Sequence, residues 1–194
     1  MIDTDRQIIF FHIPKTAGMS VGTAVFGATY QHDVELCARV ASGRVDIDRY
    51  TKFCFVRNPW DRMLSLYHQA RKPLNLKVRR RRLAYDLATA LPFDQWIRAS
   101  SEIDPLVLTG GGFFDRVTDA EGAVHVDFVG RFERIHEDFE TLCRRLHIAP
   151  TRLPHINGSR HAMYAHYYTP LARDTVHRLF EREIDWFGYR FGCN

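Results

Sequence analysis

Two short apolar runs, each ending in a charged turn, constrain this chain more than any other feature. Residues 8 to 13, IIFFHI, are followed at once by PKTAGMS, and residues 53 to 56, FCFV, are followed by RNPWDRMLSLY. Continuous runs rich in β-branched and aromatic residues are typical of strands buried on both faces of a parallel sheet. The sequence therefore predicts two core strands, each leading through a polar turn into a helix.

Helical spacing predicts the elements between and after these strands. VGTAVFG fits the first turns of a helix, and the apolar positions between Asp33 and Ala41 suggest a weaker one. Asn58 followed by Pro59 predicts a helix start, because Asn caps free backbone amides and Pro suits the first helical position. Further helices are expected over about 83–100, over 136–147, and from Thr169 and Pro170 through Phe187.

One more strand is expected near residue 130. FFDRVTDAEGAVHVDFVGRF alternates apolar and polar residues around an acidic turn closed by Gly122, which predicts a β-hairpin leading into a core strand. Strands that alternate with helices predict an α/β fold, with a mostly parallel sheet and helices on both faces. A length of 194 residues suits one domain, residues 1–194, and no internal repeat is visible.

The charge of the chain indicates which ligands it favours, and its cysteine content indicates its redox compartment. The net charge of +4 favours anionic ligands, whether nucleotides, acidic glycans, nucleic acid or anionic lipid. The four cysteines are widely spaced and lack metal-site spacing, so we expect buried thiols in a reducing compartment. The polar N-terminus lacks a secretory pattern and no window is apolar enough for a membrane span, which predicts a cytoplasmic protein without a transmembrane segment.

The turn PKTAGMS has the composition of an anion-binding loop. Gly18 would allow the backbone to turn closely, and the first amides and the dipole of the following helix attract negative charge. Thr16 and Ser20 could add hydroxyl donors, and Lys15 supplies a full charge. An ordinary turn with a solvated lysine fits this stretch equally well. The usual P-loop of nucleotide triphosphatases is excluded, because its lysine follows the second glycine and Lys15 precedes the only one.

Taken together, PKTAGMS and FVRNPWDRMLSLY resemble the PAPS-dependent sulfotransferases, especially the carbohydrate sulfotransferase-like group and its bacterial-type relatives. PAPS is 3′-phosphoadenosine 5′-phosphosulfate. The resemblance extends to VDFVGRFERIHEDFETLCRRL, to LPHINGSR and to the YY before the last helix, so it covers nearly the whole chain. It implies a P-loop-like three-layer α/β fold, with its mostly parallel sheet flanked by helices. The implied reaction moves a sulfuryl group from PAPS to an acceptor hydroxyl or amine, giving adenosine 3′,5′-bisphosphate.

The resemblance also assigns roles to individual residues. It places Lys15 on the oxygen that bridges phosphate and sulfate, and Arg57 and Ser65 on the 3′-phosphate, with Arg160 as a further contact. Met19 stands where relatives commonly have a threonine, which removes one hydroxyl contact and leaves the backbone loop. The residues implied to bind PAPS through the 5′-phosphosulfate loop are Lys15, Thr16, Ala17, Gly18, Met19 and Ser20.

The acceptor needs a group that removes its proton, and histidine suits this task near neutral pH. His32 follows the first helix, where relatives often have an acceptor-side histidine, and is our expected catalytic base together with Lys15 as the charge-stabilising group. Asp33 could orient His32 or replace it, and His68, on the helix after Ser65, is the competing base. His12 is interpreted as a core residue. The leaving group is a phosphate, so no metal is required.

Alternatives remain for the basic run and for the function. KVRRRR, residues 77–82, fits a solvated helix face or a lid, a dock for an acidic acceptor such as a sulfated or uronate-bearing glycan, or non-specific nucleic-acid binding. No base-reading motif supports the last. A nucleotide or small-molecule kinase on a related P-loop fold is the alternative function. The sequence, however, lacks the glycine-lysine order and a clear magnesium-binding carboxylate that such a kinase would need. The acceptor and the oligomeric state are not predicted.

Overall fold

The computed structural model describes residues 1–27, 46–72, 79–103, 110–149, 153 and 163–193. The chain divides into two compact units. Met1–Val56 and Arg116–Gly158 form unit 1, and Arg57–Asp115 and Ser159–Asn194 form unit 2. The single domain expected from the sequence stays a prediction, and each unit is described by itself below.

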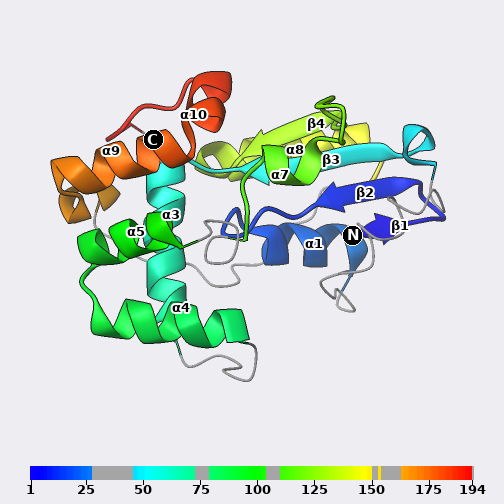
Figure 1. The fold of residues 1–194 in the computed structure, drawn as a ribbon. Helices are drawn as coiled ribbons and strands as arrows, with labels where there is room; N and C mark the ends of the chain where they lie inside the picture. The colour runs from blue at the N-terminus through cyan, green and yellow to red at the C-terminus, as the bar shows by residue number, and fades with distance from the viewer. Residues whose placement is uncertain (28–45, 73–78, 104–109, 150–152, 154–162, 194) are drawn as a thin grey trace. The chain divides into compact units, whose positions relative to one another are not determined.

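Unit 1 is built on an open, mostly parallel sheet (Figure 1). Its strands lie in the order β1 (Ile2–Asp3), β2 (Ile8–Phe11), β3 (Thr51–Val56) and β4 (Phe128–Arg131). β1 pairs antiparallel with β2, and the pairs β2–β3 and β3–β4 are parallel. The two core strands predicted from the apolar runs and the third predicted near residue 130 are thus confirmed, as is the α/β class with helices flanking the sheet.

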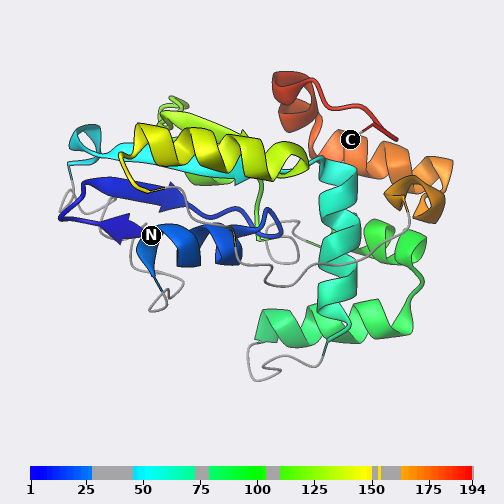
Figure 2. The same ribbon diagram turned by 180° about the vertical axis from the view of Figure 1, so that it is seen from behind.

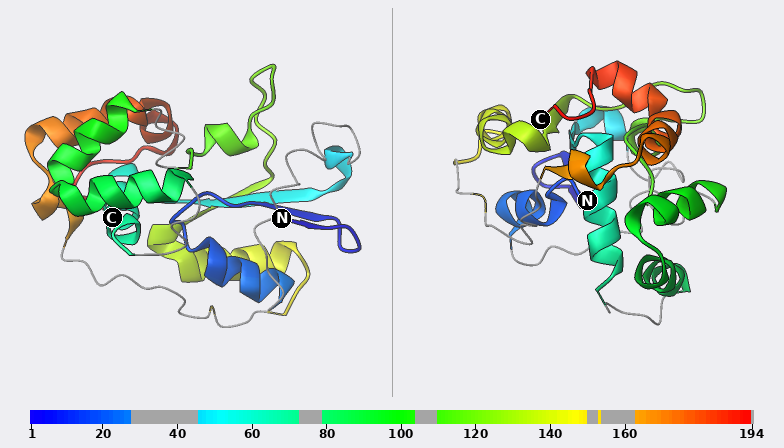
Figure 3. Two further views of the ribbon diagram at one scale, coloured as in Figure 1. Left: turned by 60° about the horizontal axis from the view of Figure 1, so that its bottom comes forward. Right: turned by 90° about the vertical axis from the view of Figure 1, so that its left-hand side faces the viewer.

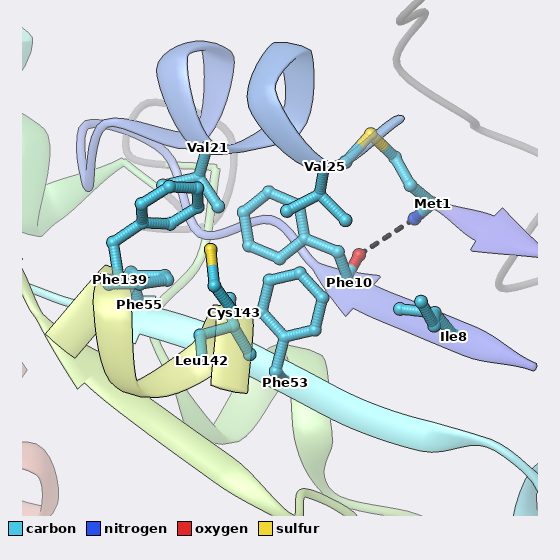
Figure 4. Packing of buried hydrophobic residues seen from close by; sticks show 10 residues of the cluster. All are labelled: Met1, Ile8, Phe10, Val21, Val25, Phe53, Phe55, Phe139, Leu142 and Cys143. Atoms are coloured by element: carbon cyan, nitrogen blue, oxygen red, sulfur yellow. Dashed lines mark hydrogen bonds between the residues drawn. The ribbon is translucent and has the colours of Figure 1, made fainter. Parts of the chain in front are cut away.

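Two helices cover the same face of this sheet. α1 (Gly18–Phe26) and α8 (Ile135–Arg145) lie side by side in the left view of Figure 3, and α8 runs along the sheet in Figure 2. Between them and the sheet is an apolar core, in which the rings of Phe10 and Phe53 stack with centroids 4.7 Å apart (Figure 4). Its buried members are Met1, Ile8, Phe10, Val21, Val25, Phe53, Phe55, Phe139, Leu142 and Cys143.

Strand alternation sends the remaining apolar side chains of β2 to the opposite face. There Ile9 is fully buried, and Phe11, Ile47 and Tyr50 pack against it. Ile47 belongs to the short 3-10 helix η1 (Ile47–Arg49), and a second one, η2 (Phe132–Arg134), joins β4 to α8. Both faces of β2 are therefore apolar, as its sequence predicted.

Unit 2 is helical and is organised around α3 (Pro59–Ala70), which contacts four other elements (Figure 1). These are α4 (Arg79–Ala90), α5 (Phe93–Glu102), η3 (Tyr164–Tyr167) and α9 (Pro170–Leu179). α9 is followed by α10 (Glu181–Phe187). The predicted start of α3 is confirmed, because the Asn58 side chain accepts a hydrogen bond from the Trp60 amide and Pro59 is the first helical residue.

The sequence predicted two continuous helices, and the structure divides each of them into two shorter helices. The 83–100 segment forms α4 and α5, separated at Leu91 and Pro92, because proline lacks an amide hydrogen and disfavours helical geometry in the residue before it. The last helix is interrupted at Phe180, whose φ of −125° is not helical. No glycine or proline lies there, and the Arg62 guanidinium packs 4.6 Å from the Phe180 ring centroid. No glycine or proline therefore marks this second break in the sequence.

The predicted hairpin is much smaller than expected. Phe114–Val117 form one helical turn, α7, and the hairpin ladder is a single bridge between Thr118 and Val124. The acidic turn is held by Asp119, whose carboxylate accepts from the amides of Glu121 and Ala123. Gly122 has a φ of 88°, so its predicted role in closing the turn agrees with the structure. The side chain of Asp119 and a few backbone hydrogen bonds therefore hold the turn, and a long strand ladder is not formed.

The cysteine prediction is only partly right. Cys54 and Cys143 are buried, as predicted, whereas Cys193 is exposed. Cys37 and the helix expected between Asp33 and Ala41 lie outside the described residues.

Candidate functional site

The turn that joins β2 to α1 has an unusual backbone. Lys15 has a φ of 71° and Ala17 a φ of 61°, both in the left-handed region. Residues other than glycine adopt this conformation at a cost of about 1–2 kcal/mol each. Between them, Thr16 is fully buried and its hydroxyl donates to the Ile13 carbonyl over 2.9 Å. Bonds within the turn thus hold Lys15 in a strained conformation.

Gly18 serves a different purpose from the one expected. It is the first residue of α1 and does not have a positive φ, so its backbone conformation does not require glycine. A Cβ atom at this position would overlap Nε2 and Cδ2 of the His12 ring. His12, expected as a core residue within the strand, is instead half-buried just after β2. Glycine is required here because the ring approaches the helix too closely for any side chain.

The start of α1 has no side-chain cap. Its N-cap residue, Ala17, makes no side-chain hydrogen bond to the helix, and the first turn holds no acidic residue. The partial positive charge of this helix start is therefore not offset by a carboxylate of its own first turn. Ser20 is buried and Met19 is 37% exposed. Such a helix start suits a phosphate or sulfate group.

The residue directly after β3 is Arg57, which is buried to 6% exposure. Its Nε donates to Asp61 Oδ2 over 2.8 Å, one helical turn further along the chain. Ser65, another turn on, is only 3% exposed, so its position off the apolar face does not leave it solvated. The contact between Asp61 and Arg57 was not predicted, although an aspartate four residues after an arginine has the spacing of such a pair.

Asn58 ties the start of α3 to the C-terminal segment. Its Oδ1 accepts from the Trp60 amide and so caps the helix. Its Nδ2 lies within donating distance of the Tyr164 hydroxyl at 3.1 Å and of the carbonyls of Arg190 and Cys193 at 3.1 and 3.0 Å. Tyr168, the second residue of the YY pair, donates to the Trp60 carbonyl over 2.7 Å. Burial raises the pKa of both tyrosines, so both stay neutral hydroxyls. No local sequence signal indicated these contacts.

Arg62, which lies within α3, has a structural role. Arg62 is fully buried, donates to the Gly111 carbonyl over 2.8 Å and lies 4.0 Å from Glu183. Glu183 in turn accepts from the Phe113 amide. Burial lowers the pKa of Arg62, and the carboxylates of Glu183 and Asp115 act in the opposite direction. Arg62 therefore secures the 111–113 segment, whereas Arg57 lies before this helix, at the end of β3.

The predicted site residues fall into three groups. Lys15 to Ser20 lie together in unit 1, whereas Arg57, just before α3, and Ser65, within α3, belong to unit 2. His32, Asp33 and Arg160 lie outside the described residues. The competing base, His68, is half-buried, with its ring edge-on to Tyr67 and Tyr167 at centroid distances of 5.6 and 5.9 Å.

The basic run is described only in part. α4 begins at Arg79, and the side chain of Arg82 is exposed and forms an ion pair with Asp86 at 3.1 Å. For this residue the structure agrees with a solvated helix face. Among the residues that the structure describes, no group of three or more His, Cys, Asp or Glu side chains could hold a metal ion. None of the helices in the described ranges is long and apolar enough to cross a membrane.

The family model of the sulfotransferases matches residues 1–190. The chain belongs to the sulfotransferase family. The match includes both strand-to-helix turns and the C-terminal segment that Asn58 contacts, so it covers the resemblance drawn from the sequence. Neither the curated proteins nor the solved structures give a match to this chain. The family implies a transferase that moves a sulfuryl group from a donor to an acceptor.

Proposed function

We propose that this sulfotransferase uses PAPS as its donor and a carbohydrate or glycoconjugate as its acceptor, and releases adenosine 3′,5′-bisphosphate. The observation that carries the proposal is the turn after β2. It combines a lysine in a constrained conformation with an uncapped helix start, which together suit the phosphosulfate group. The family supplies the reaction class, and this turn supports the donor.

In the proposed reaction the amides at the start of α1 hold the 5′-phosphosulfate, and Lys15 lies at the bridging oxygen. The acceptor oxygen forms a bond to sulfur while the bond from sulfur to the bridging oxygen breaks. Negative charge then grows on that oxygen, and the Lys15 ammonium stabilises it. Such a reaction depends on positioning and charge stabilisation, and no metal is required in principle.

Arg57 and Ser65 are proposed to bind the 3′-phosphate, with Arg160 as a further contact. The bond from Arg57 Nε to Asp61 fixes the plane of the guanidinium, whose planar fork of donors suits phosphate. The 3′-phosphate distinguishes PAPS from ATP, so this contact would select the donor.

His32 is proposed as the base that takes the acceptor's proton, with Asp33 as its partner or substitute. A base must be unprotonated, so the rate should fall as pH drops through its pKa. His32→Gln should flatten this acid limb of the pH profile with little change in PAPS affinity. If the limb persists in His32→Gln and disappears in His68→Gln, the base is His68 instead.

Equilibrium binding tests the donor. Calorimetry should show that adenosine 3′,5′-bisphosphate binds much more tightly than ATP. Tighter binding of ATP would contradict the proposal and favour a kinase. An acceptor screen with PAPS should compare uronate-bearing glycans, neutral glycans and small phenols, since the net charge of +4 favours an acidic acceptor. Sulfation of phenols alone would overturn the carbohydrate assignment.

A further inference from the structure

In the turn after β2, the ring of His12 packs against Gly18. A Cβ atom at Gly18 would overlap two ring atoms of His12, so the ring occupies the space where a side chain would lie. We propose that His12 is a positioning residue, which sets the spacing between the end of β2 and the first turn of α1 and so places Lys15. This inference rests on the proposed function of the turn.

The residues on both sides of the His12 ring are fixed by the core of unit 1. On the strand side the His12 ring stacks on Phe10, with centroids 5.7 Å apart, and Phe10 is fully buried in the core of unit 1. On the helix side the ring meets Gly18, whose helix is anchored in the same core by Val21 and Val25. A side chain at residue 18 would therefore displace the His12 ring or shift α1 against β2.

The residues between these ends have little freedom to absorb such a shift. Lys15 and Ala17 both adopt a costly left-handed conformation, and the Thr16 hydroxyl is bonded to the Ile13 carbonyl. A displaced α1 would therefore move both the Lys15 ammonium and the helix amides relative to the phosphosulfate. Misplacement of binding groups by about 1 Å can cost about 100-fold in rate.

The test compares Gly18→Ala, His12→Ala and the double variant, using calorimetric binding of adenosine 3′,5′-bisphosphate and the KM for PAPS. Gly18→Ala should weaken binding by about 10- to 100-fold, because the new methyl group pushes the ring away. The double variant should bind more tightly than Gly18→Ala, because the methyl group then enters space that the ring has left. Such recovery is the non-additivity expected of two residues in contact.

A matched control separates positioning from stability. A Cβ atom at Gly130 of β4 would overlap the Phe55 ring in the same way, but within the sheet. Gly130→Ala should lower the melting temperature and leave the affinity of the folded protein for adenosine 3′,5′-bisphosphate unchanged. If Gly18→Ala behaves like Gly130→Ala, His12 serves the fold alone and the inference is overturned.

Two further outcomes keep the inference distinct from the proposed function. If Gly18→Ala does not fold, the double variant is the test. Recovery of both folding and binding in the double variant supports the positioning role of His12. Folding without binding by the double variant overturns it. If the wild-type protein fails to bind adenosine 3′,5′-bisphosphate at all, both the proposed function and this inference fall. Normal wild-type binding with unchanged binding by Gly18→Ala refutes the inference alone.

Discussion

The two strand-to-helix turns of this protein begin their helices in opposite ways. After β2, the N-cap residue of α1 is Ala17, which has a left-handed backbone and makes no side-chain cap. After β3, the N-cap residue of α3 is Asn58, whose side chain caps the helix and bonds to Tyr164 and two carbonyls of the C-terminal segment. One turn is strained and uncapped, and the other is capped and cross-linked by hydrogen bonds.

This difference suggests two ways to bind an anion. The first turn can offer backbone amides and the helix dipole, because no side chain of the helix start takes their place. The second turn uses an amide of α3 for its own cap, so an anion there depends on the Arg57 side chain, oriented by Asp61. The first turn thus suits a group that must be held close to the backbone, and the second suits selection by charge.

The largest expected effect comes from the charge in the uncapped turn. Lys15→Ala should lower turnover with PAPS by about 100- to 1000-fold, the usual cost of losing one group that stabilises developing charge. The melting temperature should change little, since the left-handed backbone is the same for alanine. Steady-state kinetics and thermal unfolding measure the two effects. Near-normal turnover would leave the backbone amides as the sole source of catalysis in this turn.

A smaller effect is expected from the arginine of the capped turn. Arg57→Ala should weaken binding of adenosine 3′,5′-bisphosphate by about 10- to 100-fold, the value of a charged hydrogen bond, and should spare adenosine 5′-monophosphate. Calorimetry with both nucleotides measures this selectivity. Arg82→Ala is the control, since it removes another arginine–aspartate pair of the same spacing. Equal losses for both nucleotides would mean that Arg57 acts through the fold.

The cap itself can be removed. Asn58→Ala should destabilise the protein by about 1–2 kcal/mol, because it loses the helix cap and the bonds from Nδ2 to the C-terminal segment. Urea unfolding measures the change. Thr169→Ala, which removes the cap of α9 and its bond to the Ala172 amide, provides a comparison at a more exposed site and should cost less. A neutral Asn58→Ala would show that the two turns do not differ in this respect.

The smallest effect should have the opposite sign. Ala17→Gly should stabilise the protein by up to about 1 kcal/mol, because glycine avoids the left-handed cost, and part of that gain is offset by its greater freedom in the unfolded chain. The same urea series measures it. Destabilisation by this substitution would show that the uncapped turn is not strained at Ala17.

Much of the candidate site follows from local sequence rules. The strand before each turn, the cap at Asn58, the proline after it and the anion-binding composition of PKTAGMS depend on neighbouring residues alone. Such patterns act over a few residues, so the sequence shows them directly. The helix break at Pro92 is also local in origin, although the sequence analysis treated 83–100 as continuous.

Other features depend on how separate elements pack together. The sequence by itself determined the α/β class and the two turns, because periodicity and turn residues are local properties of the chain. The family followed from the resemblance of its motifs and was shown by the match over residues 1–190. Only the tertiary structure decided that Gly18 faces the His12 ring, that Asn58 holds Arg190 and Cys193, and that Phe180 interrupts the last helix. Each of these depends on close packing or on a hydrogen bond between segments that the fold brings together, and such contacts have no local sequence signature.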